Sequence, residues 1–187
     1  MGATISLPGP AAFPSAPVIG PTSKESMGHN LSALLFQSGF ASAIWPAANR
    51  GIGYPFMLTE HRTLLQMYVH NGTVVSGNLD AGVFREDGTK VVAMGATAQA
   101  GTSALQLLNV TDTVLQPWTQ YYAWLAIDNI TATTLRVSGG VSLAQTMMGG
   151  VVQMASAYSA GLVATVTAAA VDTLYLPDFG MVFASTV

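Results

Sequence analysis

Turn signals at nearly even spacing between Gly77 and Arg136 constrain this chain more than any other feature. Short runs of strand-forming residues alternate there with four turn-forming groups, Asp87-Gly88, Gln99-Ala100-Gly101-Thr102, Gln116-Pro117 and Asp128-Asn129. Short strands separated by regular turns are typical of an antiparallel β-sandwich. No catalytic pattern interrupts the segment. The segment therefore predicts a structural scaffold that functions by contacting other molecules.

The strand-forming runs can be followed along the chain. Asn78–Met94 reads as a hairpin with Asp87-Gly88 at its tip, and Asn71-Gly72 is a favoured tight-turn pair. Pro55 predicts an edge position for its strand, because proline cannot donate to a sheet. The other predicted strands are Ile52–Leu58, Leu64–Val69, Ala104–Val110, Gln120–Ile127, Thr131–Val137, Leu162–Thr167 and Gly180–Ala184. About eight strands in one domain predict an all-β, antiparallel β-sandwich of jelly-roll type.

The 187 residues predict one domain with an extension. Residues 1–28 read as an extended Pro/Gly-rich N-terminal arm, since prolines break helices and favour extended backbone. Residues 29–187 form the predicted sandwich domain, with a core module at about 48–136. A small-residue-rich connection follows at about 138–160, and closing strands continue to 187. Leu31–Phe36 is predicted to form either a helix or a strand, and Val141–Met148 a helical turn.

The arm has two interpretations. It is either a disordered tail or a segment that lies across a neighbouring subunit and becomes ordered on assembly. Its candidate contacts are the apolar residues Phe13, Val18 and Ile19. Residues 1–23 contain no Lys or Arg, so they do not resemble a signal peptide.

Charge is scarce. Only 8% of residues are charged, against about 25% in an average soluble domain. A neutral surface predicts coverage by other subunits, hence a homo-oligomer; a sparsely charged monomer is the alternative. The net charge of −3 provides no positively charged surface for nucleic acid, and the absence of cysteine excludes disulfides. The uncharged stretch from Val137 to Val171 is too rich in Gly, Ser, Thr and Gln to predict a membrane span.

Candidate chemistry is sparse. The histidines share no metal-binding spacing; they are His29, His61 and His70. Asp80, Glu86 and Asp87 are candidates for a calcium site near the hairpin, but the loop lacks the usual ligand density. Glu60-His61-Arg62 is an acid/base cluster or, more simply, a polar loop. The chain contains no nucleophile elbow or phosphate-binding loop, so we expect no enzyme, no metal and no cofactor.

The segment around Trp124 is a dense aromatic strand. Strand alternation puts Tyr121, Ala123 and Leu125 on one face and Tyr122, Trp124 and Ala126 on the other. One face must be core. The other is packed under a loop or forms an interaction patch.

About residues 48–136 carry a specific series of short motifs. These are Ala48-Asn49-Arg50, Tyr54-Pro55-Phe56, Asn71-Gly72, Val75-Ser76-Gly77-Asn78, Asp80–Phe84, Asp87-Gly88, Gly95–Gln106, Thr111-Asp112-Thr113, Tyr121-Tyr122 and Asp128-Asn129. In order and spacing they resemble a β-sandwich module of tailed-bacteriophage virion proteins, a family of unassigned role. The chain departs from that pattern at Trp118, where the module has glycine, and at Phe84-Arg85, where it has Tyr-Asp. The family has no known catalytic residues to carry over.

The resemblance implies a non-enzymatic structural protein on the surface of a phage particle, present in the host cytoplasm before assembly. The first expectation is a capsid decoration or cement protein that contacts the major capsid protein, with trimers as the natural symmetry. The alternative is a host-recognition module attached to tail or baseplate proteins, in which loops bind a host glycan. The exposed loop contacts expected for that role are Asn71, Asp87 and Trp118. An envelope-degrading enzyme is a third class without a supporting motif.

Overall fold

The computed structural model describes residues 18–19, 40–137, 152–154, 161–171, 175 and 177–184. All regular structure in these residues is β, and the strands pair antiparallel, which confirms the all-β prediction. None of them belongs to a helix suited to crossing a bilayer. The strands are β1 (Val18–Ile19), β2 (Phe40–Ile44), β3 (Arg50–Met57), β4 (Arg62–His70), β5 (Asn78–Arg85), β6 (Lys90–Ala93), β7 (Thr97–Ala98), β8 (Leu105–Leu115), β9 (Gln120–Ile127), β10 (Thr133–Val137), β11 (Val152–Met154), β12 (Ala168–Val171) and β13 (Phe179–Phe183).

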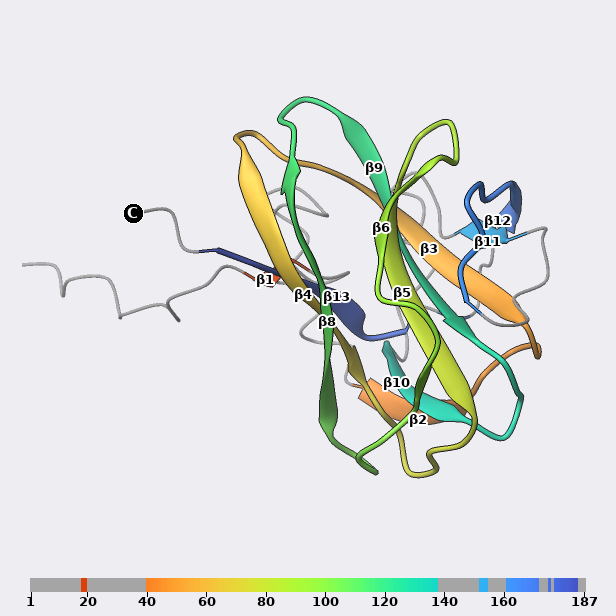
Figure 1. The fold of residues 1–187 in the computed structure, drawn as a ribbon. Coiled ribbons are helices and arrows are strands. Elements are labelled where there is room, and N and C mark those ends of the chain that lie inside the picture. The colour runs from red at the N-terminus through yellow and green to blue at the C-terminus, as the bar shows by residue number, and fades with distance from the viewer. Residues whose placement is uncertain are drawn as a thin grey trace, which may run out of the picture.

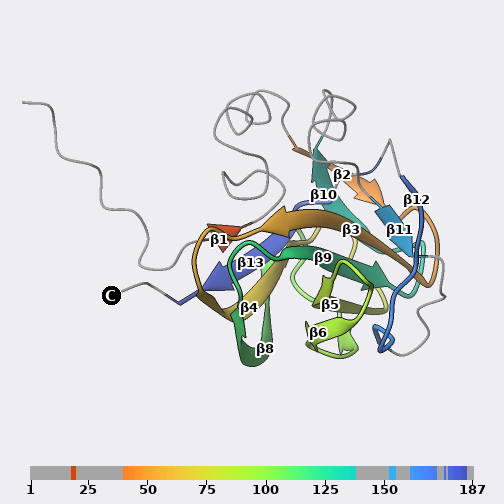
Figure 2. The same cartoon turned by 90° about the horizontal axis from the view of Figure 1, so that it is seen from above.

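The strands form three sheets (Figures 1 and 2). A four-stranded sheet has the order β1-β13-β4-β8, and a seven-stranded sheet has the order β12-β11-β3-β9-β5-β6 with β7 beside β5. β10 and β2 form a small third sheet. The chain therefore moves between the two large sheets, from β3 to β4, back to β5, out again to β8 and back to β9.

The main core lies where the two large sheets face each other. The Tyr54 ring of β3 packs against Phe179 of β13 with centroids 4.9 Å apart, and its hydroxyl donates to the Phe179 carbonyl at 3.2 Å. Tyr121, Ala123 and Leu125 of β9 belong to this core, so the predicted alternation of β9 is confirmed. The largest fully buried side chains include Trp45, Tyr54, Phe179, Phe183, Ile52 and Leu64.

The other face of β9 belongs to a second, smaller core. Phe84, Trp124 and Ala126 are covered there by Leu162 and Val166, which come from a segment far along the chain. The alternative that this face is packed under a loop is thus correct. We call residues 161–167 the covering segment.

Several sequence predictions hold in detail. β5 and β6 form the expected hairpin, and Gly88 at its tip has a φ of 84°, which favours glycine. The last predicted strand is β13, which pairs with β4.

The edge position predicted for the strand of Pro55 is wrong, because β3 lies between β11 and β9. Pro55 is tolerated there because β11 pairs with β3 only at Ile52 and Gly53, so nothing in the described chain pairs beside Pro55 on that side.

Other predictions are wrong. Leu162–Thr167 is not a strand, because its extended backbone makes only one isolated bridge, from Thr165 to Thr89. The strand predicted at Ala104–Val110 continues to Leu115 as β8, since Thr111–Thr113 stays paired beyond a register shift against β4. Asp112 consequently lies in a strand and not at a turn. The runs Leu31–Phe36 and Val141–Met148, and most of the 1–28 arm, lie outside the described residues.

Asn71-Gly72 does not form a tight turn. Asn71 is fully buried, and the connection from β4 to β5 runs through residues 71–77 between the two large sheets. The Asn71 amide donates to Gln106 Oε1 at 3.0 Å and accepts from Gln99 Nε2 at 2.9 Å. These bonds hold the connection in place, because buried amide groups must be paired. They also explain the Gly95–Gln106 motif, which supplies both glutamines.

Candidate functional site

Two connections of the seven-stranded sheet lie next to each other and share a hollow surface. One is the β5–β6 hairpin tip, which includes Glu86 and Asp87, and the other is the β8–β9 turn, which includes Trp118. Arg85, Glu86 and Asp87 line two adjoining hollows, one of which also contacts Trp118, Thr119 and Gln120. Trp118 and the hairpin tip therefore border one continuous concave surface.

The hairpin tip is fixed by its own backbone. The Gly88 N–H donates to the Arg85 carbonyl at 2.9 Å, and the Thr89 N–H donates to Asp87 Oδ1 at 2.8 Å. This hydrogen bond from Thr89 lowers the pKa of Asp87, so its exposed carboxylate stays ionised at neutral pH. The tip presents a negative charge in a fixed position.

Trp118 occupies an unusual backbone conformation. Its φ is 56°, in the left-handed region that glycine tolerates and that a bulky side chain rarely adopts. Its N–H donates to the Leu58 carbonyl at 2.9 Å, which holds the turn against the β3–β4 connection. The side chain is 70% exposed. The residue thus carries a strained backbone and presents a large aromatic ring to solvent.

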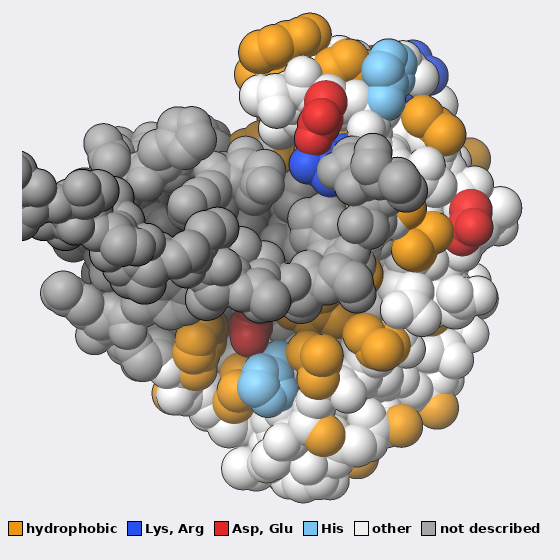
Figure 3. Space-filling model, turned by 90° about the vertical axis from the view of Figure 1, so that its left-hand side faces the viewer, with side chains coloured by type: hydrophobic (Ala, Val, Ile, Leu, Met, Phe, Trp, Pro, Cys, Tyr) orange, Lys and Arg blue, Asp and Glu red, His pale blue; other side chains and the backbone are white. Residues whose placement is uncertain are grey.

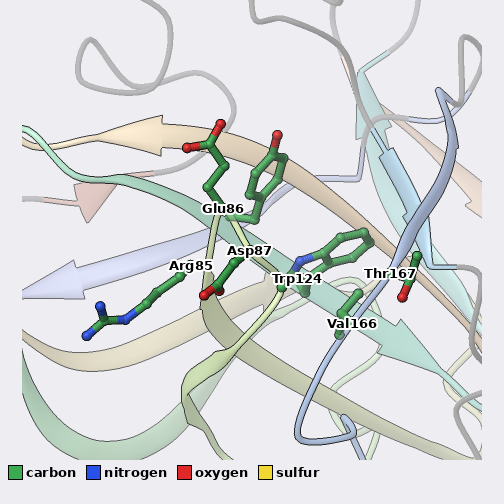
Figure 4. Close-up of a pocket in the computed structure, with 8 residues that line it drawn as sticks. Arg85, Glu86, Asp87, Trp124, Val166 and Thr167 are labelled. Carbon is green, nitrogen blue, oxygen red and sulfur yellow. The ribbon is translucent and has the colours of Figure 1, made fainter.

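Beneath the hairpin tip lies a cavity of about 230 Å³. It is lined by Arg85, Glu86, Asp87, Gly88, Tyr122, Trp124, Val166 and Thr167. Figure 4 shows Trp124 between the hairpin tip and the covering segment, with its indole nitrogen on the side toward Asp87. The Tyr122 and Trp124 rings stack, with centroids 6.4 Å apart.

The Trp124 side chain lies between two glycine residues on the neighbouring strands. Its pairing partners on the two neighbouring strands are Gly53 in β3 and Gly82 in β5. A Cβ atom on Gly53 would lie 2.6 Å from Trp124 Cδ2, so the indole rests directly on that backbone. Trp124 is only 2% exposed, and no described residue accepts a hydrogen bond from its indole N–H.

The covering segment forms the far wall of the cavity and is tied to the sheet. The Leu162 N–H donates to Asp80 Oδ2 at 2.7 Å, and the Val166 N–H donates to the Gly88 carbonyl at 2.9 Å. Lys90 Nζ donates to the Leu162 carbonyl at 3.1 Å. Burial raises the pKa of Asp80, whose other oxygen accepts from the Gly95 N–H. These contacts fix the wall that Val166 and Thr167 provide.

The structure brings two of the three predicted loop contacts together. Asp87 and Trp118 border the same concave surface, whereas Asn71 is buried in the amide network and is not an exposed contact. Of the predicted arm contacts, Val18 and Ile19 form β1 and pair with Val182 and Met181 of β13. Phe13 lies outside the described residues.

Sequence reasoning named most of the lining residues separately but did not predict that they form one cavity. Arg85 could be noticed in the sequence, because the module that the sequence resembles has aspartate at this position. Glu86 was named as a calcium-site candidate and Tyr122 as part of the aromatic strand, but only the fold brings Glu86 and the aromatic strand to one cavity. Val166 and Thr167 had no local signal, since they reach the site through a long-range contact.

The other polar candidates lie apart from the cavity. Asp80 is buried under the covering segment, and no three carboxylate or imidazole groups gather as a metal site in the described part of the chain. Glu60 pairs with Arg62 in the β3–β4 connection and not with His61. His70 Nδ1 lies 3.3 Å from Asp178 Oδ2, and burial raises the pKa of Asp178. Residue 29, the remaining histidine, lies outside the described ranges.

A scan against models of known protein families finds no match to this chain, and a search of curated proteins finds none either.

Proposed function

We propose that this protein is a non-enzymatic structural component of a tailed-phage particle, built as a β-sandwich of jelly-roll type with an N-terminal arm. The topology supports the fold proposal. β3 and β4 run from one large sheet to the other, and β9 and β8 run alongside them as antiparallel partners. Two chain segments wound together across two sheets are the basis of a jelly roll.

Within the particle, we place the protein on the capsid as a decoration or cement protein. The observation that carries this proposal is the edge strand β8. It exposes Leu105, Leu107 and Val114, and its only charged residue is Asp112. Edge strands of free proteins are usually protected by charge, bulges or proline. Asp112 and the register shift against β4 both lie in the second half of β8, so its first half, with Leu105 and Leu107, is unprotected and better suited to burial against a neighbouring subunit.

The arm supports the same role. Val18 and Ile19 add a short strand to the opposite edge of that sheet, beside β13. Backbone pairing needs no particular side chains, so an arm of this kind attaches to any exposed strand edge. On the face in Figure 3, the described charged side chains are few and are surrounded by hydrophobic and uncharged ones. Many weak, repeated contacts of this neutral surface give retention by avidity, and trimers are the symmetry we propose.

The test is immunogold labelling of intact particles, followed by deletion of residues 1–28. We expect label over the whole head, and we expect the deletion to release the protein from heads while the sandwich stays folded by circular dichroism. Full head occupancy without the arm would contradict arm-based retention. Label restricted to the tail tip would contradict the capsid role itself.

A second candidate is a tail-attached host-recognition module, and one observation favours it. Trp118 and Asp87 border a concave surface at one end of the domain, as expected of recognition loops on a rigid scaffold. If this candidate is correct, label lies at the tail and a Trp118→Gly phage adsorbs poorly. Normal adsorption by that phage would exclude this use of the loops.

A further inference from the structure

The cavity under the hairpin tip contains an indole N–H that has no protein acceptor in the described part of the chain and is open to the cavity. Trp124 is 2% exposed, lines the cavity, and its indole N–H has no acceptor among the described residues. A molecule that enters the cavity displaces water from this N–H, so it must supply an acceptor in place of the water. The occupant must therefore offer a hydrogen-bond acceptor.

The opposite wall offers acceptors. Glu86 and Asp87 line the cavity, and neither carboxylate forms an ion pair within the described residues. Asp87 Oδ1 already accepts from the Thr89 N–H, and the charge on Asp87 persists at neutral pH. The occupant must therefore also offer hydrogen-bond donors.

The charges in the lining exclude simple ions. A phosphate or carboxylate would be repelled by Glu86 and Asp87, while a cation without an acceptor atom would leave the Trp124 N–H unpaired. A purely apolar molecule would leave the carboxylates desolvated without partners. A hydroxyl group is both donor and acceptor, so a neutral polyhydroxylated molecule satisfies both walls.

The aromatic residues specify the shape of that molecule. Tyr122 stacks on Trp124 inside the cavity, and Trp118 presents its ring beside the same hairpin tip. The volume of about 230 Å³ is below the roughly 300 Å³ of typical ligand pockets, so it suits one ring-sized group. A sugar ring has hydroxyl groups around its edge and an apolar face for stacking.

We infer that this cavity binds a single neutral sugar unit at the end of a saccharide, with the adjoining unit lying against Trp118. The Trp124 N–H donates to a ring or hydroxyl oxygen, and Glu86 and Asp87 accept from hydroxyl groups. The strained backbone of Trp118 is consistent with selection for its ring, since strain is concentrated at functional sites. The site gives the recognition candidate its ligand class, and it is equally compatible with a protein displayed on the capsid.

The test uses the full chain in solution and the three tryptophan indole N–H signals in a ¹H–¹⁵N correlation spectrum. The probes are glucose, galactose, mannose and N-acetylglucosamine, together with a disaccharide of each, at tens of millimolar. At least one neutral sugar shifts the Trp118 and Trp124 signals together. Trp45 is the internal reference, because its indole N–H is buried and donates to the Arg50 carbonyl at 2.9 Å.

Matched variants locate the binding. Trp118→Gly keeps the backbone conformation and weakens disaccharide binding by about tenfold, which corresponds to about 1.4 kcal/mol. Glu86→Gln keeps the shape, removes the charge and weakens binding several-fold. Ile130→Ala, an exposed residue in the β9–β10 connection, leaves binding unchanged.

Three outcomes overturn the inference. They are no Trp124 shift with any sugar in the set, a shift of Trp118 alone, and a response of Trp124 to phosphate or ethylamine in place of sugars. None of these results bears on head occupancy, which is measured on particles. Failure of the sugar site is thus distinguishable from failure of the capsid role.

Discussion

At the scale of single residues, Trp118 combines a bulky side chain with a backbone conformation that favours glycine. The turn has a positive φ, the module that the sequence resembles has glycine there, and this chain has a tryptophan that is 70% exposed. A non-glycine residue in the left-handed region costs about 1–2 kcal/mol. The departure at Trp118 was visible in the sequence, but its meaning depended on the dihedral angle.

The backbone cost can be measured by comparing Trp118→Gly with Trp118→Ala. Both variants remove the ring, but only glycine relieves the strained φ. After the greater chain entropy of unfolded glycine is allowed for, we expect the Gly variant to be more stable by about 1 kcal/mol. In a chain of this size that raises Tm by about 2–4 °C. Differential scanning calorimetry provides the measurement, and equal Tm values would show that this turn is unstrained.

Asp80 gives a pH dependence of known sign. Burial raises its folded-state pKa, against the lowering effects of the Leu162 and Gly95 N–H groups and of Lys90. The unfolded chain therefore loses this proton first as pH rises above about 3.8, and the contribution of Asp80 to stability falls from there to its folded pKa. An asparagine there keeps one carbonyl acceptor but replaces the other oxygen by an NH2 donor, so one of the two N–H groups of Leu162 and Gly95 loses its acceptor at a cost of about 1–3 kcal/mol.

We accordingly expect Asp80→Asn to be less stable than the wild type, with the difference largest at acid pH and smaller at neutral pH. Urea unfolding from about pH 3.5 to 7 measures it. Asp87→Asn is a suitable control, because Asp87 is exposed and its pKa is lowered. A difference that grows with pH would contradict the raised pKa of Asp80.

At the scale of elements, the sequence predicted what local patterns determine. The β5–β6 hairpin needed only the Asp87-Gly88 pair between alternating residues, and the two faces of β9 followed from strand geometry. Asn71-Gly72 failed because its turn propensity is outweighed by a buried amide network with Gln99 and Gln106. The cavity could not be predicted, since its walls come from segments about 80 residues apart that the fold brings together.

The close packing of the Trp124 ring on the Gly53 backbone can be tested by substitution of Gly53. A methyl group on Gly53 would overlap the indole and the Ala123 carbonyl, so Gly53→Ala must displace Trp124 or separate β3 from β9. We expect a loss of about 3 kcal/mol in the free energy of unfolding and a shifted Trp124 indole signal. Gly95→Ala is the contrast, because a methyl group there meets nothing within 4 Å and only its φ of 89° opposes the change. A Gly53→Ala protein as stable as Gly95→Ala would contradict the close seating of the ring.

At the scale of the whole molecule, the scarcity of charge finds its counterpart in the edge strand β8. Its outward side chains Leu105 and Leu107 are more than half exposed. A protein with so few charges has little to prevent association through such an edge. The composition predicted burial by other subunits, but only the topology identified which strand is left at an edge.

Placing lysine at both Leu105 and Leu107 should therefore prevent self-association. We expect the double variant to sediment as a smaller species than the wild type, with the free energy of unfolding changed by less than about 0.5 kcal/mol per site. Ile130→Lys, at an exposed apolar position away from β8, should leave the sedimentation coefficient as it is. Equal sedimentation of the double variant and the wild type would remove β8 from the self-association interface.

The late position of the covering segment and β13 has a consequence for synthesis on the ribosome. Trp124 receives its cover only about 25–30 residues after β10 ends, and β4 receives its neighbour β13 only about 45 residues after that point. At about 5–20 residues per second, the nascent chain exposes these apolar faces for a few seconds. A growing chain with an open sheet edge is a target for chaperones and for pairing with its neighbours on the same messenger. Translation speed through this stretch therefore influences how much protein reaches the folded state.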